Sequence, residues 1–258
     1  MRSDDLILVL GAFKRSGTNH LRDLLCLHPA CDQSQIPEDF ILAESDKLLA
    51  FCHDTIIRWG AGCKPLMPRM LKHLQSSMLQ LLVGNGNVDR LVSKTPSTEG
   101  VGNVDTIFPG AKIIFIVRDG RDTIESGRRS FEWGIKEKSA QWADGVGRIF
   151  AFEERFPGRS IRISYEDITT NLKETLVPVL EHCNLHVGDY PWDLAARAPI
   201  RGSSDIRQKF HERMDWKPRK KWDDFSPIGR WQSGNWSDQD IKDFEQAAGE
   251  MNALLGYT

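Results

Sequence analysis

A short loop near the start of the sequence combines basic, hydroxyl and glycine residues. The apolar run Leu6–Leu10 before it fits a buried strand, and leucines recur at helical spacing after it. Free backbone N–H groups at the N-terminus of a helix, together with the helix dipole, favour a bound anion. We therefore expect a phosphate-like group at six residues of this loop, which are Lys14, Arg15, Ser16, Gly17, Thr18 and Asn19.

This loop differs from the Walker A motif of nucleoside triphosphatases. That motif places Lys, and then Ser or Thr, directly after its second glycine. Here Thr18 and Asn19 follow Gly17, and the basic residues come before the glycine. The loop therefore lacks the lysine that contacts the β- and γ-phosphates of a nucleoside triphosphate.

A second cation and hydroxyl follow a later apolar run. Arg118 comes directly after Lys112–Val117, and Ser126 lies eight residues further on in the next helical pattern. The arginine fork forms charge-assisted hydrogen bonds, and a serine adds a neutral donor. Arg118 and Ser126 could clamp one phosphate; the alternative is that Arg118 and its acidic neighbours form surface ion pairs.

Strands alternate with helices along the chain, which predicts an α/β fold with a central parallel sheet between two helical layers. Ligands of such sheets bind at the carboxyl ends of the strands, where both anion-binding segments would lie. The expected strands are Leu6–Leu10, Arg90–Ser93, Lys112–Val117 and Ser160–Ser164. The expected helices are Thr18–Leu27, two within 41–82, Asp122–Phe131, Gln141–Phe156, Asp167–His182 and one from Asp238 to about Leu255.

Composition restricts the class of protein further. The 258 residues can form one α/β domain, and a net charge of −2 gives no overall basic field for nucleic acid. No apolar run is long enough to cross a membrane. Five widely spaced cysteines without a C-x-x-C pair favour free thiols in a reducing cytoplasm over a disulfide framework or a zinc site.

These motifs together resemble the sulfotransferases that use 3′-phosphoadenosine 5′-phosphosulfate (PAPS). In that family a loop like Lys14–Asn19 holds the 5′-phosphosulfate, and an arginine and serine like Arg118 and Ser126 hold the 3′-phosphate. Further matches follow in family order, so the resemblance spans residues 6 to about 255. They are Ser93-Lys-Thr-Pro96, Ser164-Tyr-Glu-Asp-Ile168 and Ile228-Gly-Arg-Trp231.

The resemblance implies roles for single residues. Arg15 takes the place of the family's catalytic lysine or arginine, and Lys94 would contact the transferring sulfuryl group. Tyr165, Gly229 and Arg230 would contact the nucleotide. PAPS would be the co-substrate and 3′,5′-adenosine bisphosphate (PAP) the product, with no metal ion required because cationic side chains supply the positive charge.

The general base has to come from another segment, because Pro96 stands where the cytosolic branch of the family has histidine. Branches that use a carboxylate, such as the tyrosylprotein and carbohydrate sulfotransferases, place it beyond the phosphosulfate loop. Glu38 is the best candidate, with Asp39 and Glu44 as alternatives. Glu38 could instead only interact with a helix dipole.

We thus expect one sulfotransferase domain over residues 1–258, with about 185–235 as a lid or acceptor-facing segment. The partner would be a hydroxyl-bearing acceptor, namely a carbohydrate, lipid or small molecule, with a peptide tyrosine also open. Two other functions remain: a P-loop kinase or nucleotidase, and a nucleotide-binding module without catalysis.

Overall fold

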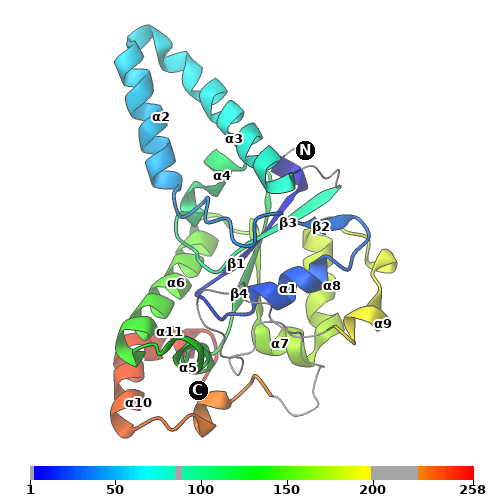
Figure 1. Ribbon diagram of the computed structural model, residues 1–258, viewed down its shortest axis with the longest axis vertical. Helices are drawn as coiled ribbons and strands as arrows, with labels where there is room; N and C mark the ends of the chain where they lie inside the picture. The colour runs from blue at the N-terminus through cyan, green and yellow to red at the C-terminus, as the bar shows by residue number, and fades with distance from the viewer. Residues whose placement is uncertain (1–2, 85–88, 199–225) are drawn as a thin grey trace.

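The computed structural model describes residues 3–84, 89–198 and 226–258. At its centre is a parallel sheet with strand order β2-β3-β1-β4-β5 (Figure 1). Four strands confirm the predicted ones, whereas β2 was missed because it is a short and mostly polar edge strand. The strands are β1 (Leu6–Gly11), β2 (Cys31–Gln33), β3 (Arg90–Thr95), β4 (Lys112–Val117) and β5 (Ser160–Ser164).

Both faces of the sheet are buried, which explains the continuous apolar runs. On β1, Leu6, Leu8 and Leu10 pack into one hydrophobic cluster, whereas Ile7 and Val9 pack into the other. This division follows from the alternation of side chains along a strand. A parallel sheet covered on two sides by helices requires apolar residues in both positions.

Helices form the two outer layers, so the three-layer α/β/α prediction is confirmed. The first layer contains α3 (Met67–Val83), α4 (Val104–Ile107), α5 (Gly120–Phe131), α6 (Ile135–Arg155), α10 (Asp238–Phe244) and α11 (Glu250–Leu254). The second contains α1 (Thr18–Leu25), α7 (Tyr165–Thr170), α8 (Leu172–His182) and α9 (Trp192–Ala195). None of the helices in the described ranges is long and apolar enough to cross a membrane.

Two helices that were expected to be continuous are divided. Asn171 separates α7 from α8, and its non-helical backbone fits the preference of asparagine for helix ends. A π-helical turn, Glu245–Gly249, lies between α10 and α11. Ser237 and Asp240 form a capping box at the start of α10.

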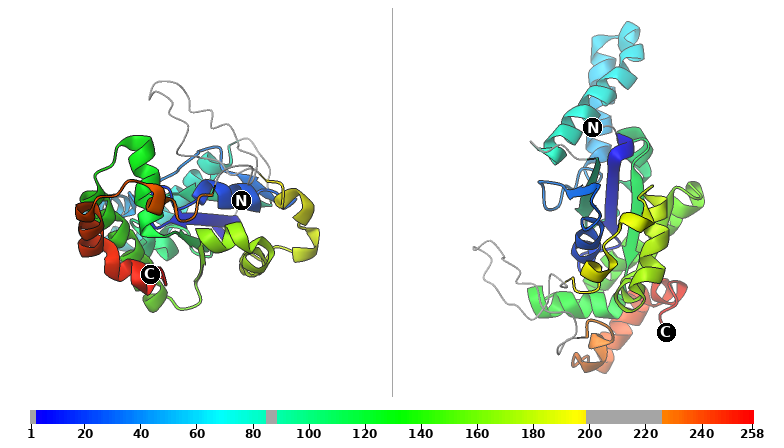
Figure 2. Two further views of the ribbon diagram at one scale, coloured as in Figure 1. Left: turned by 90° about the horizontal axis from the view of Figure 1, so that it is seen from below. Right: turned by 90° about the vertical axis from the view of Figure 1, so that its right-hand side faces the viewer.

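One helical hairpin leaves the body of the molecule. The helices α2 (Ser45–Trp59) and α3, joined by the 3₁₀ turn Ala61–Leu66, form an arm that extends away from the sheet (Figures 1 and 2). Leu79 and Leu82, near the end of α3, are buried in the core and fix the arm at its root. The sequence predicted both helices but not their extension beyond the core.

Candidate functional site

The predicted anion-binding loop makes a tight turn between β1 and α1. Gly17 has a φ of 102°, and a Cβ atom there would lie 2.3 Å from the Tyr165 ring, so glycine is required for two separate reasons. Arg15 also has a positive φ, 73°, which is uncommon for a residue with a side chain. The Ser16 hydroxyl fixes the turn by donating to the Phe13 carbonyl oxygen over 2.7 Å.

The rest of the loop lies at the start of α1. Thr18 is buried, Asn19 is half-buried and Lys14 is exposed. Because α1 begins at Thr18, its first backbone N–H groups have no partner inside the helix. The structure therefore places Lys14 at the edge of the loop and the N–H donors inside it.

Arg15, Arg118 and Ser126 meet at the carboxyl ends of β1 and β4. Arg15 Nε donates to Ser126 Oγ over 3.0 Å, and Arg118 Nη1 donates to the Arg15 carbonyl oxygen over 3.2 Å. β1 and β4 are neighbours in the sheet, which brings together residues that are far apart in the sequence. Arg118 is only 5% exposed, and among the described residues its Nε has no hydrogen-bond partner.

Positive charge is concentrated in this cluster. Burial and the charge of Arg118 lower the pKa of Arg15 to about 10; Arg230 acts in the same direction, and Tyr165 opposes them. The guanidinium carbon of Arg118 lies 4.7 Å from the centroid of the Tyr165 ring, a cation–π distance. A buried cation is costly unless something compensates its charge. The carboxylates of Asp122 and Glu166 interact with the charge of Arg118, and a bound anion would compensate the arginines further.

A second group of charged residues lies at the end of β3. Lys94 Nζ contacts Glu38 Oε1 at 2.6 Å, and the side chains are 3% and 39% exposed, respectively. Burial lowers the pKa of Lys94, whereas the hydrogen bond and charge of Glu38 oppose that shift. The structure thus brings together two residues that sequence analysis named from separate motifs.

The two alternative carboxylates lie in different surroundings. Asp39 accepts hydrogen bonds from the Ser93 hydroxyl, over 2.5 Å, and from the Ile41 N–H, over 2.9 Å. Glu44 is exposed before the start of α2 and pairs with Lys47. Asp39 is therefore beside the end of β3, whereas Glu44 interacts with the root of the arm.

The segment 226–236, here called the closing segment, lies against α5. The Asp122 carboxylate accepts from the Gly229 N–H over 2.7 Å and from the Trp231 N–H over 3.0 Å. Arg118 Nη2 donates to the Pro227 carbonyl oxygen. The predicted nucleotide-contacting residue Gly229 is thus fixed next to Arg118. The adjacent Arg230 is near enough for its charge to add to the lowering of the Arg15 pKa and to oppose the rise that burial gives to the pKa of Tyr165.

Sequence analysis missed the residues that fix this segment. Asp122 is 1% exposed, and burial raises its pKa. Glu125 is equally buried and accepts a hydrogen bond from Trp236 Nε1 over 2.9 Å. Asp122, Glu125 and Ser126 recur at helical spacing on one face of α5, so the sequence contained a signal for them. Most of the predicted lid, residues 199–225, lies outside the described residues.

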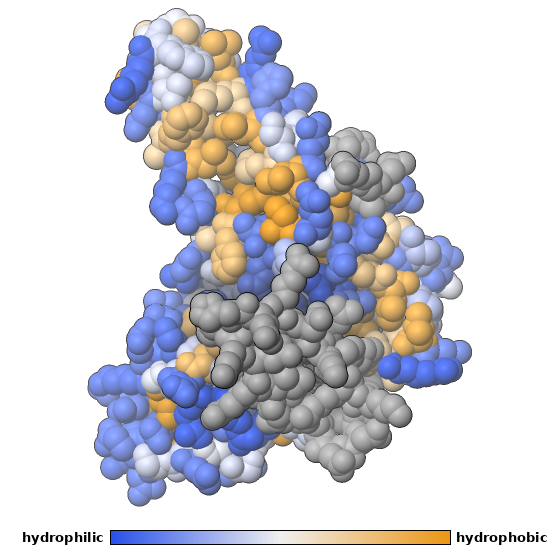
Figure 3. Space-filling model, viewed as in Figure 1, coloured by the Kyte–Doolittle hydropathy of each residue, from blue (hydrophilic) through white to orange (hydrophobic). Residues whose placement is uncertain are grey.

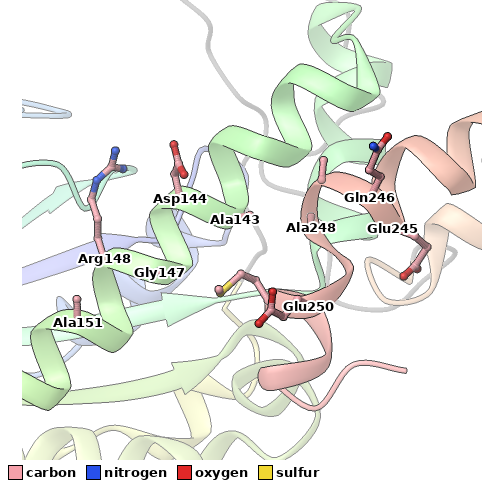
Figure 4. A pocket seen from close by; sticks show the side chains of 11 residues that line it. Ala143, Asp144, Gly147, Arg148, Ala151, Glu245, Gln246, Ala248 and Glu250 are labelled. Carbon is pink, nitrogen blue, oxygen red and sulfur yellow. The ribbon is translucent and has the colours of Figure 1, made fainter.

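A separate groove of about 570 Å³ lies between α6 and the C-terminal helical segments (Figure 4). Asp144 and Arg148 line it from α6, and Glu245 and Glu250 line it from the other side. None of the predicted site residues is among its lining residues. We therefore locate the candidate site at the strand ends and not in this groove.

Solved structures with a similar fold include the sulfotransferase domain from the Synechococcus PCC 7002 olefin synthase. That comparison gives a TM-score of 0.58 at 18% identity and covers 100% of this chain and 97% of the other. Mouse sulfotransferase SULT7A1, solved in complex with PAP, gives a TM-score of 0.51 at 15% identity, covering 100% of this chain and 90% of the other. At such identities the likeness establishes the fold alone.

Sequence comparisons identify the family. The protein-tyrosine sulfotransferase of Drosophila melanogaster is 31% identical over 124 residues, which are 46% of this chain and 24% of that relative, so the match spans about a quarter of the relative's length. The model of the sulfotransferase family matches residues 7–189, which include both predicted anion-binding motifs and the Glu38–Lys94 pair. Because this match covers well over half of the sequence, the chain belongs to the sulfotransferase family.

Proposed function

We propose that the protein transfers a sulfuryl group from PAPS to the hydroxyl group of an acceptor. The cluster of half-buried Arg15 with buried Arg118 and Ser126 carries this proposal, because it offers fixed cations and a hydroxyl donor to an anion. The fold it shares with a PAP-bound sulfotransferase supports the choice of nucleotide.

Each phosphate-binding part has its own role in the proposal. The N–H groups and side chains of the Lys14–Asn19 loop bind the 5′-phosphosulfate, and Arg118 and Ser126 bind the 3′-phosphate. The Nε of Arg118, which has no hydrogen-bond partner within the described ranges, fits this role because a phosphate oxygen would accept its hydrogen. The ring of Tyr165 packs against the guanidinium of Arg118, and Gly229 and Arg230 cover the nucleotide.

Charge moves toward the 5′-phosphate when the bond between sulfur and the bridging oxygen breaks. Arg15 stabilises that charge, and a preorganised donor in such a position contributes about 10²–10³ in rate. Lys94 stabilises the sulfuryl oxygens from the side of β3. Sulfur forms its new bond to the acceptor oxygen in line with the leaving phosphate, which departs as part of PAP.

Glu38 is the base in this scheme. Its carboxylate is 39% exposed, so an acceptor can reach it, and its partner Lys94 holds it at the end of β3. The acceptor proton passes to Glu38 as the oxygen attacks. Asp39 remains the alternative base, although its carboxylate already accepts two hydrogen bonds.

The proposal leaves the acceptor open among carbohydrates, lipids and small molecules. We also propose that residues 1–258 form one sulfotransferase domain, in which about 185–235 face the acceptor. A cytoplasmic location fits the five free cysteines, three of which have thiol pKa values raised to about 12, chiefly by burial. Two alternatives are a P-loop kinase or nucleotidase and a non-catalytic nucleotide-binding module.

Thermal unfolding with two ligands tests this function. A ligand at 100 times its Kd adds roughly 2.7 kcal/mol, which should raise the Tm by about 5–10 °C at this chain length. We expect PAP to do so and ADP with Mg²⁺ to have little effect. The reverse result would favour a kinase or nucleotidase, and a PAP shift without sulfuryl transfer to any screened acceptor would favour the binding module.

A further inference from the structure

The outer end of the α2–α3 arm exposes large apolar side chains. Ile57, Trp59 and Leu66 are 55%, 58% and 40% exposed, respectively, and lie at or beside the turn that joins the helices. Phe51 and Leu81, 58% and 57% exposed, continue the apolar surface toward the root. Figure 3 shows hydrophobic residues along this arm with hydrophilic ones beside them. Exposed apolar patches of this kind mark interaction surfaces.

The same part of the arm is strongly basic. The sequence has no Asp or Glu between Asp54 and Asp89, although the whole chain has a net charge of −2. Four basic side chains on the outer half of the arm are exposed, namely Arg58, Lys64, Arg69 and Lys72. From residue 55 to the end of α3 the arm therefore combines apolar and positively charged side chains, and Asp54, one turn before Arg58 on α2, is the nearest exposed carboxylate.

We infer that the outer end of the α2–α3 arm docks on an anionic lipid surface. The end is a protruding turn rather than a groove, so Ile57, Trp59 and Leu66 can enter the boundary between headgroups and acyl chains. The basic residues beside them would contact the anionic headgroups. Tryptophan is enriched at such boundaries because its ring is amphipathic.

Charge argues against a second copy of the chain as the occupant. Two arms that packed end to end would bring eight exposed basic side chains together with only the two Asp54 carboxylates beside them, so like charges would dominate the contact. An anionic bilayer offers the opposite charge. The inference does not depend on the proposed function, because the outer end of the arm lies away from the sheet (Figure 1).

Co-sedimentation with vesicles tests the inference. Wild-type protein should bind vesicles of phosphatidylcholine with 30% phosphatidylserine much more tightly than vesicles of phosphatidylcholine alone. Each basic residue near such a surface contributes about a fivefold gain in affinity, so the triple variant R58E/K64E/R69E should lose at least about 100-fold. The variant I57S/W59S/L66S should lose at least about tenfold, because it removes buried apolar area.

Leu254→Ser is the matched control, because Leu254 is 60% exposed on α11 and lies outside the arm. It should bind vesicles like wild type. Unfolding midpoints in urea show whether each variant is folded, and this check is independent of any nucleotide. The inference is overturned if the wild-type protein does not bind anionic vesicles, or if both triple variants bind them like wild type. It is also overturned if the wild-type protein is a dimer that I57S/W59S/L66S converts to a monomer.

Discussion

The positively charged side chains at the two ends of the candidate site have different partners. Beside β4, the guanidinium groups of Arg15 and Arg118 contact a hydroxyl, a carbonyl and aromatic rings. Beside β3, Lys94 is paired with the carboxylate of Glu38 at 2.6 Å. At the first end the carboxylates of Asp122 and Glu166 act on Arg118 only through their charge, whereas at the second end the carboxylate contacts the cation directly.

This difference separates the two substrates of the proposed reaction. A group of arginines suits a nucleotide with two charged phosphate groups, whereas a lysine paired with a carboxylate suits an uncharged hydroxyl that must give up a proton. The partners of a lysine or arginine therefore define its role better than its presence in a motif does. Variants that affect one end alone test this separation.

The largest effect is expected for the base. Glu38→Gln should lower kcat by about 10²–10⁴, because the amide accepts no proton, while PAP affinity stays close to wild type. Transfer from radiolabelled PAPS to an acceptor found by screening measures the first quantity, and calorimetric titration with PAP measures the second. Asp54→Asn, an exposed carboxylate on the arm, is the control and should change neither. If Asp39→Asn alone lowers kcat, Asp39 is the base.

Next in size is the loss of the proposed 3′-phosphate contact. Arg118→Ala should weaken PAP binding by at least about 100-fold, because hydrogen bonds to a charged group contribute about 1.5–3 kcal/mol each. The affinity for adenosine 5′-phosphate, which lacks the 3′-phosphate, should change far less. Equal losses for the two nucleotides would mean that Arg118 only supports the fold.

A smaller effect is expected where the closing segment is fixed. Asp122→Ala leaves the N–H groups of Gly229 and Trp231 without their acceptor, so the free energy of unfolding should fall by about 1–3 kcal/mol. Urea unfolding measures this change, and stopped-flow experiments should show faster PAP release. Asp144→Ala on the exposed side of α6 is the control, with an expected change within about 0.5 kcal/mol. Unchanged PAP release in Asp122→Ala would separate the closing segment from nucleotide binding.

The smallest effect is a change of PAP affinity at alkaline pH. The lowered pKa of Arg15, about 10, means that half of these side chains are neutral at that pH in the absence of ligand. An anion binds the protonated form, so PAP affinity should fall by about twofold between pH 8 and pH 10. Arg15→Met should bind more weakly but lose this decline. Because the folded-state pKa of Arg15 lies below its usual value, its contribution to folding stability should rise as pH increases above about 10.

Most of the fold and half of the site were predictable from local patterns. Buried parallel strands such as β1 and β4 are continuous apolar runs, and the proposed phosphate-binding residues follow them, so spacing was sufficient to name those residues. β2 has three residues at a sheet edge and no apolar pattern, so it gave no signal. The break at Asn171 was hidden because the helical pattern continues on both sides.

Contacts between segments that are distant in the sequence could not be predicted from local patterns. The pairing of Glu38 with Lys94 depends on how the loop after β2 folds across the end of β3, which no local pattern specifies. The closing segment is fixed by Asp122, whose acceptor role is visible only once 226–236 lies on α5. The arm protrudes because only some of its apolar residues pack against the core, and the whole fold determines which of them do so.

The contact between Gly17 and Tyr165 has a consequence for variation at these two positions. They face each other across the end of β4, so a bulkier residue at position 17 and a ring at position 165 exclude one another. The restriction is unequal, however, because removing the ring frees the space but leaves the left-handed backbone of the loop. Natural or engineered relatives of this chain should therefore exchange Tyr165 more readily than Gly17, and glycine should persist where the ring has been lost.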